Sequence, residues 1–181
     1  MNLQKKEARR LVRQRSRELL GKSRVRALSG EWLKDLEQRA DFSSARVVLV
    51  FSSLPDEVPT QMLLTHWYQQ KTLLLPAVIG GDLHLHPYQG EDKLQMGAFG
   101  ILEAQTPSWQ ELENIDLAII PGLAFDAQGY RLGRGRGFYD RLLAHPHFST
   151  IPLLGLAYRF QQLDAVPHEQ HDQRVDEVIW V

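Results

Sequence analysis

The sequence predicts an α/β fold of three layers, a Rossmann-like arrangement in which helices flank a mainly parallel central sheet. Two observations support this prediction: short runs of consecutive apolar residues, typical of buried strands, and helical patterns that alternate with them. The chain has 181 residues, of which 43% are hydrophobic and 24% charged. These values are ordinary for one soluble globular domain. We therefore expect a single domain over residues 1–181.

The first 40 residues are expected to form two helices. Residues 3–20 are amphipathic, because their apolar side chains fall within one arc of a helix, namely Ala8, Leu11, Val12 and Leu19. A second helical pattern covers residues 27–39, and residues 21–26 are the expected connection. Two further helices are predicted over residues 61–70 and 137–144.

The predicted strands are short apolar runs, at residues 46–51, 72–75, 83–88, 116–120, 153–157 and 177–181. Histidine and leucine alternate in the third run, which is typical of a more exposed strand after a turn at residues 80–81. In folds of this class ligands bind beyond the carboxyl ends of the strands. The loops at residues 52–60 and 121–136 are expected there.

The composition excludes several classes of protein. The chain has no cysteine, which excludes disulfides, thiolate metal sites and a cysteine nucleophile. The N-terminal sequence lacks the apolar region of a secretory signal. No run of residues approaches the roughly 20 apolar residues that a membrane span needs. We expect a cytoplasmic protein without a membrane partner.

Charge is distributed unevenly along the chain. Residues 1–26 carry ten basic and two acidic side chains, although the whole chain has a net charge of −1. Such an asymmetry points to a polyanionic partner near the N-terminus, which is either nucleic acid or the phosphates of a nucleotide. The apolar arc of the same helix favours docking against the domain over a free basic tail, and weak nucleic-acid affinity stays possible as a side property.

The segment at residues 131–140, RLGRGRGFYD, is called the arginine loop below. Its three glycines let successive N–H groups surround an anion, and its three arginines offer guanidinium groups suited to phosphate oxygens. The pattern is neither a Walker A loop nor a GxGxxG fingerprint. RGRG sequences also occur in disordered RNA-binding tails, but the apolar residues around this segment favour a packed phosphate-binding loop.

Asp140 closes the arginine loop. A carboxylate there would repel phosphate unless a cation intervened, which makes Asp140 a candidate Mg²⁺ ligand. It could equally be an acidic residue in the first turn of a helix. Elsewhere, His84 and His86 share one face of a strand, but a third metal ligand is not evident nearby. Met96 and Phe99 are interpreted as core residues in the first place, with a ligand pocket as the alternative.

Several ordered motifs together resemble the 5-formyltetrahydrofolate cyclo-ligase family. They are Lys5 with Arg9, residues 55–60 (PDEVPT), 97–103 (GAFGILE), 121–126 (PGLAFD), 129–140 (GYRLGRGRGFYD) and 169–176 (EQHD to VD). They span nearly the whole chain, and the fifth is the most specific. One residue departs from the family pattern: Phe138 stands where the family usually has a tyrosine.

The resemblance implies conversion of 5-formyltetrahydrofolate to 5,10-methenyltetrahydrofolate, with ATP as co-substrate, Mg²⁺ as cofactor, and release of ADP and phosphate. In the mechanism proposed for the family, the formyl oxygen is phosphorylated and N10 then attacks the formyl carbon. The alternatives are an RNA-binding protein that uses the basic N-terminal helix, or another α/β enzyme that binds a phosphate ester.

The resemblance also implies roles for individual residues. The implied catalytic residues are Arg134 and Tyr139. The implied metal ligands are Asp140 and Asp172. The implied ATP contacts are Lys5, Arg9, Arg131, Gly133, Arg134, Gly135, Arg136, Gly137, Phe138 and Tyr139. The implied contacts with the folate substrate are Ser52, Glu57, Arg134, Gly135, Gly137 and Phe138.

Overall fold

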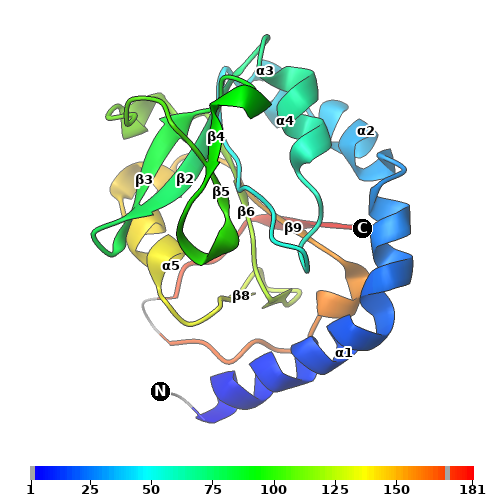
Figure 1. Ribbon diagram of the computed structural model, residues 1–181. Helices are drawn as coiled ribbons and strands as arrows, with labels where there is room; N and C mark the ends of the chain where they lie inside the picture. The colour runs from blue at the N-terminus through cyan, green and yellow to red at the C-terminus, as the bar shows by residue number, and fades with distance from the viewer. Residues whose placement is uncertain (1–2, 170–171) are drawn as a thin grey trace.

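The computed structural model describes residues 3–169 and 172–181 (Figure 1). Its α-helices are α1 (Leu3–Ala27), α2 (Glu31–Glu37), α3 (Ala40–Ser44), α4 (Gln61–Trp67) and α5 (Phe138–Leu143). Short 3-10 helices cover Glu91–Lys93, Ala98–Gly100, Leu112–Asn114, Pro146–Ser149 and Arg159–Gln161. Within the described ranges, none of the helices is long and apolar enough to cross a membrane.

Six strands form the central sheet in the order β10-β9-β6-β1-β2-β3. Their bounds are β1 (Val47–Leu49), β2 (Thr72–Ile79), β3 (Asp82–Pro87), β6 (Leu117–Ile120), β9 (Leu153–Ala157) and β10 (Glu177–Trp180). Neighbouring strands are parallel, except that the edge strand β3 runs antiparallel to β2. Two small antiparallel pairs complete the structure, β4 (Leu94–Met96) with β5 (Leu102–Ala104) and β7 (Ala124–Phe125) with β8 (Arg131–Leu132).

Successive side chains of the buried strands point to opposite faces of the sheet, and each face has its own core. Val48 and Leu73 pack on one face in a cluster with residues of α2, α3 and α4, including Leu36. Leu49 and Leu74 pack on the other face in a cluster with Leu143 of α5. Helices therefore cover both faces, which confirms the predicted three-layer α/β fold with a mainly parallel sheet.

Several predicted boundaries were wrong. Helix α1 continues through the predicted connection to Ala27, because a single glycine such as Gly21 costs a helix only about 1 kcal/mol. The second helix begins only at Glu31, after Gly30 with φ 75°. Strand β2 extends to Ile79, four residues beyond the prediction, because β3 pairs with it along its outer half. The short strands of the two small pairs were not predicted.

The strand order creates the point at which ligands bind in folds of this class. From β1 the chain moves first to β2 on one side, and later to β6 on the other side of β1. The loops that leave the carboxyl ends of β1 and β6 therefore diverge and open a crevice. These loops are residues 50–60 and 121–123. Both lie within or next to the loops predicted at residues 52–60 and 121–136, where the sequence placed a ligand.

Candidate active site

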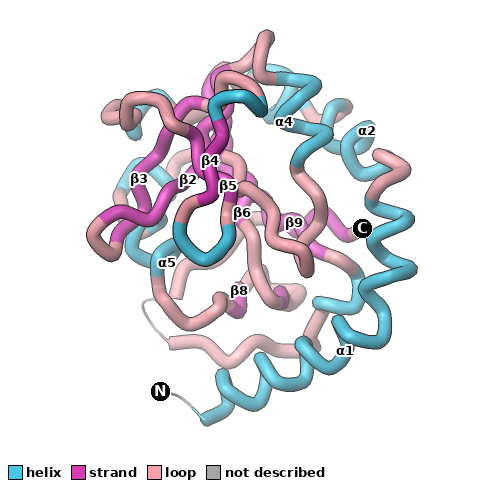
Figure 2. The backbone as a smooth tube through the Cα atoms, viewed as in Figure 1, coloured by secondary structure: helices cyan, strands magenta, loops and turns pink. Residues whose placement is uncertain are grey.

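A cavity of about 430 Å³ opens at this crevice, a size typical of small-molecule sites. Figure 2 shows the loops that gather between the sheet and α1. The lining residues come from the loops after β1 and β6, the β2–β3 hairpin, the hairpin of β4 and β5, and the arginine loop. They are Phe51, Ser52, Leu54, Pro55, Asp56, Glu57, Pro76, Val78, Leu83, Phe99, Ile101, Glu103, Pro121, Gly122, Arg131, Gly133, Arg134, Arg136, Gly137, Phe138, Tyr139 and Asp140.

Arg134 joins the arginine loop to the loop after β1. Its Nη2 donates to Glu57 Oε1 at 2.9 Å and to Asp56 Oδ1 at 2.6 Å. Glu57 is only 7% exposed, and its Oε2 accepts from the Leu54 N–H at 2.9 Å. Burial raises the pKa of the Glu57 carboxyl, although the Arg134 guanidinium opposes that shift. The two loops thus enclose a buried carboxylate with one hydrogen-bonded cation.

Arg131 is a buried residue at the start of the arginine loop. It is 8% exposed, and its Nη2 donates to Asp140 Oδ1 at 2.7 Å. Its guanidinium carbon lies 5.6 Å from the centre of the Tyr139 ring. Burial, together with the nearby Glu57 carboxylate, raises the pKa of the Tyr139 hydroxyl, and Arg131 opposes this shift. The hydroxyl therefore keeps its proton at neutral pH and can act as a hydrogen-bond donor.

The glycines of the arginine loop allow close packing and an unusual backbone. A Cβ at Gly133 would lie 3.0 Å from Arg131 Nη1. Gly137 has φ 69° immediately before α5, a conformation that glycine adopts without strain. These positions let the loop turn tightly over the buried arginine and present its backbone to the cavity.

The start of α1 lies against the same loop. Arg9 Nε donates to the Gly133 carbonyl at 2.8 Å, and Lys5, one helical turn earlier, forms an ion pair with Asp172 at 2.5 Å. A β-bridge between Tyr130 and Arg174 fixes the segment that follows Asp172 beside the arginine loop. The amino end of α1, the arginine loop and the C-terminal segment are thus neighbours although they are distant in sequence.

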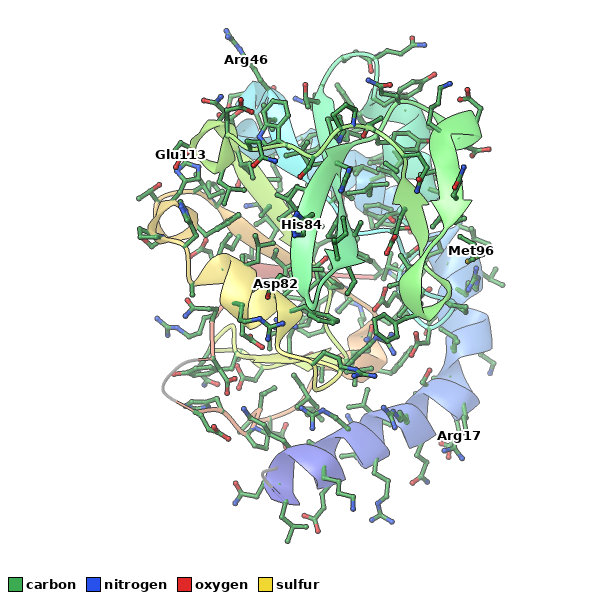
Figure 3. The ribbon with its side chains drawn as sticks, turned by 60° about the vertical axis from the view of Figure 1, so that its left-hand side comes forward. Arg17, Arg46, Asp82, His84, Met96 and Glu113 are labelled. Carbon is green, nitrogen blue, oxygen red and sulfur yellow. The ribbon has the colours of Figure 1, made fainter. Side chains whose placement is uncertain are left out.

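The other wall of the cavity is mainly apolar and comes from β2, β3 and the hairpin of β4 and β5. Phe99 in that hairpin is 55% exposed with φ 59°, and its ring centre lies 6.1 Å from that of Phe138. The interpretation of Phe99 and Met96 as core residues was wrong. Phe99 lines the cavity, whereas Met96 is 69% exposed on the outer side of the hairpin (Figure 3).

The structure brings most of the predicted site residues into one cavity. Ser52, Glu57 and the predicted residues of the arginine loop line it, apart from Gly135. Gly135 lies next to the Arg9 guanidinium instead. Lys5, Arg9 and Asp172 are not lining residues, although Arg9 contacts the loop at Gly133.

Two acidic lining residues were not predicted. Asp56 could have been inferred from its position beside Glu57. The position of Glu103 in the cavity could not be inferred from the sequence, because it depends on how the hairpin of β4 and β5 packs. Glu103 Oε1 accepts from the Val78 N–H at 3.2 Å, and its carboxylate occupies the space that a Cβ at Gly97 would need.

The structure gives no support to a histidine metal site. His84 is exposed and His86 is buried, with Nδ1 2.6 Å from the Thr106 carbonyl oxygen. Figure 3 shows His84 on the outer strand β3. Among the described residues, no group of three or more histidine or acidic side chains could hold a metal ion. Residues 170–171 of the C-terminal motif lie outside the described part of the chain.

The chain matches the model of the 5-formyltetrahydrofolate cyclo-ligase family over residues 2–181. It is 31% identical to the 5-formyltetrahydrofolate cyclo-ligase of Haemophilus influenzae over 150 residues, which cover 76% of this chain and 74% of that protein. It is 32% identical to the enzyme of the same name from Escherichia coli K12 over 166 residues, which cover 83% and 91%.

Solved structures lead to the same family. The structure of Aquifex aeolicus 5,10-methenyltetrahydrofolate synthetase superposes with a TM-score of 0.83 at 30% identity and covers 98% of this chain and 90% of that chain. A 5,10-methenyltetrahydrofolate synthetase from Mycoplasma pneumoniae has the same fold, with a TM-score of 0.71 at 20% identity and 98% coverage of both chains.

Proposed function

Because this chain belongs to the 5-formyltetrahydrofolate cyclo-ligase family, we propose that it closes the ring of 5-formyltetrahydrofolate with ATP and Mg²⁺. The products are 5,10-methenyltetrahydrofolate, ADP and phosphate. One observation carries the proposal: a single cavity joins an apolar aromatic wall to a wall of arginines and carboxylates. A flat, hydrophobic folate ring and a polyphosphate need these two surfaces side by side.

The arginine loop is the proposed ATP site. The glycine backbone and the guanidinium groups of Arg131, Arg134 and Arg136 would contact phosphate oxygens. Each charged hydrogen bond contributes about 1.5–3 kcal/mol. Lys5 and Arg9 would add charge from α1, because Arg9 already contacts the loop carbonyl of Gly133. The rings of Phe138 and Tyr139 complete the proposed nucleotide contacts.

The folate substrate is proposed to lie between the loop after β1 and the aromatic wall. Glu57 is held by two donors and lines the cavity, so it can accept hydrogen bonds from the N–H groups of a pterin ring. Ser52 would contact the same substrate, and Phe138 would pack on it, with Phe99 opposite. Arg134, with the adjacent glycines at 135 and 137, would lie between folate and ATP.

The residues present fit Mg²⁺ of the kind that binds together with a nucleotide. Mg²⁺ usually binds through one or two carboxylates plus substrate phosphates and not in an all-protein cage. Asp140 lines the cavity next to the arginine loop, and Asp172 lies beside Lys5. Asp140 and Asp172 are the proposed ligands. When bound, the ion would neutralise charge on the phosphates during transfer.

In the proposed reaction the formyl oxygen attacks the γ-phosphorus of ATP and ADP leaves. N10 then attacks the formyl carbon and loses its proton to water, and the former formyl oxygen leaves with phosphate. The chain has no cysteine, and this route needs no protein nucleophile. Arg134 would hold the phosphoryl oxygens against the formyl group, and the protonated Tyr139 hydroxyl would donate to the oxygen that gains charge.

The test is a turnover assay with purified protein, 5-formyltetrahydrofolate, ATP and Mg²⁺, with each component omitted in turn. Near-ultraviolet absorbance of a methenyl folate should appear only in the complete mixture. Methenyl formation without ATP, or ADP formation without folate, would reject the proposal. A cytoplasmic location, where ATP is abundant, belongs to the same proposal and is checked by cell fractionation.

A further inference from the structure

Two ion pairs in the structure share one pattern. In each, a cation that we assign to ATP contacts a carboxylate that we assign to Mg²⁺. Arg131 Nη2 lies 2.7 Å from Asp140 Oδ1, and the two side chains are 5% and 22% exposed. Lys5 Nζ lies 2.5 Å from Asp172 Oδ2, with exposures of 14% and 11%. Both pairs are largely shielded from water, so their partners interact more strongly than a surface pair would.

The pair at Arg131 leaves hydrogen-bonding capacity unused. The Nε of Arg131 is buried and has no hydrogen-bond partner among residues 3–169 and 172–181. A buried donor without a partner costs free energy, yet Arg131 lines the cavity and lies within the arginine loop. The side chain therefore has an unused donor beside the proposed phosphate site, and a second acceptor there would complete its hydrogen bonds.

The arginine loop and its flanking residue Tyr130 connect the two pairs. Arg9 Nε contacts Gly133 of the arginine loop, and Lys5 precedes Arg9 by one helical turn. Across the loop, Tyr130 bridges to Arg174, two residues after Asp172. A polyphosphate on the arginine loop would thus approach both cations, and a metal ion on that polyphosphate would approach both carboxylates.

We propose that Arg131–Asp140 and Lys5–Asp172 are resting ion pairs that exchange partners when ATP and Mg²⁺ bind together. This inference rests on the proposed function. The phosphates take the two cations, and the metal ion takes the two carboxylates, so every charge regains an opposite partner. ATP alone would leave Asp140 without its ion pair beside the phosphates, and Mg²⁺ alone would leave Arg131 without its carboxylate. Each ligand therefore binds well only with the other, and the coupling is reciprocal.

One substitution should strengthen the binding of metal-free ATP and at the same time reduce the effect of Mg²⁺ on ATP binding. Asp140→Asn removes the charge that holds Arg131 but also weakens the metal site. The variant should bind metal-free ATP about fivefold more tightly than the wild-type chain does, because Arg131 no longer has to leave a carboxylate. Addition of Mg²⁺, which should strengthen ATP binding roughly 10-fold to 100-fold in the wild type, should strengthen it less than about threefold in the variant.

Isothermal titration calorimetry of ATP, in EDTA and in MgCl₂, measures both affinities without turnover. A double-mutant cycle separates exchange from simple repulsion by Asp140. In an Arg131→Gln background, Asp140→Asn should no longer improve binding of metal-free ATP. Asp82→Asn is a matched charge control, since Asp82 pairs with Arg141 in α5 and does not line the cavity. It should change either affinity less than about twofold.

The proposal is overturned if Asp140→Asn binds metal-free ATP no better than the wild type, or if the gain persists in the Arg131→Gln background. If Asp140→Asn does not fold, as judged by thermal melting, Asp172→Asn decides in the same way through Lys5. A wild-type chain that fails to bind ATP even with Mg²⁺ would instead reject the proposed function, so the two failures are distinguishable.

Discussion

The arginine loop and helix α1 are both rich in basic residues, but their side chains have different surroundings. In the loop, Arg131 and Arg134 line a cavity and each contacts a carboxylate. On α1, Arg10, Arg13 and Arg17 are exposed, and Figure 3 shows Arg17 on the outer side of the helix. The helix concentrates charge, whereas the loop places charge where water is partly excluded. The comparison indicates that surroundings, more than the number of basic residues, define a phosphate site.

The largest expected effect tests the loop. Arg134→Ala should lower turnover about 100-fold to 1,000-fold, because it removes a preorganised cation from the proposed transfer site. It also removes the Arg134 donor from the buried Glu57 carboxylate, which keeps its hydrogen bond from the Leu54 N–H. Initial rates of methenyl formation measure the effect, and circular dichroism checks the fold. A loss below about fivefold would place Arg134 outside the reaction.

Two arginines of α1 test whether contact with the arginine loop, and not charge alone, determines ATP binding. Arg9 contacts the Gly133 carbonyl, whereas Arg13, one turn further along, is exposed. Arg9→Ala should weaken binding of ATP with Mg²⁺ about tenfold, since one charged hydrogen bond is worth about 1.4 kcal/mol or more. Arg13→Ala should change it less than about twofold. Calorimetric titration measures both variants, and equal losses would mean that charge alone matters.

The next test uses the pH dependence of stability. Burial, opposed by Arg134, raises the pKa of Glu57. A raised pKa in the folded state contributes stability below the unfolded pKa of glutamate, and that stability is lost as pH rises through the folded pKa. The free energy of unfolding of the wild type should therefore fall relative to that of Glu57→Gln as pH rises. Urea unfolding at several pH values measures the difference, and a pH-independent difference contradicts it.

The smallest expected effect concerns nucleic acid. If the exposed side of α1 binds RNA phosphates, that binding should be weak and should fall steeply between about 50 and 200 mM salt. Replacing both Arg13 and Arg17 with alanine should abolish it without altering turnover. Fluorescence anisotropy with a labelled RNA measures the affinity. Tight binding that persists at high salt would mean that α1 has a second function.

The sequence was informative where one local property decides the structure. Runs of buried β-branched residues such as residues 46–51 predicted strands, and the motif at residues 131–140 predicted a ligand loop. The sequence was less informative where the position of a residue depends on contacts between segments that are distant in the chain. Phe99 lines the cavity because β4 and β5 pair beneath it and its backbone takes φ 59°. Glu103 enters the site by packing under Gly97. The ion pairs of Lys5 and Arg131 depend on three segments whose proximity no local pattern records.

The most direct measurement follows the formyl oxygen. In the proposed reaction this cavity brings the formyl group to ATP, so that the oxygen is phosphorylated before the ring closes. Turnover of substrate labelled with ¹⁸O in the formyl group should transfer the label to inorganic phosphate, which ³¹P NMR detects as an isotope shift. Label found in water, with unlabelled phosphate, would contradict phosphorylation of the formyl oxygen.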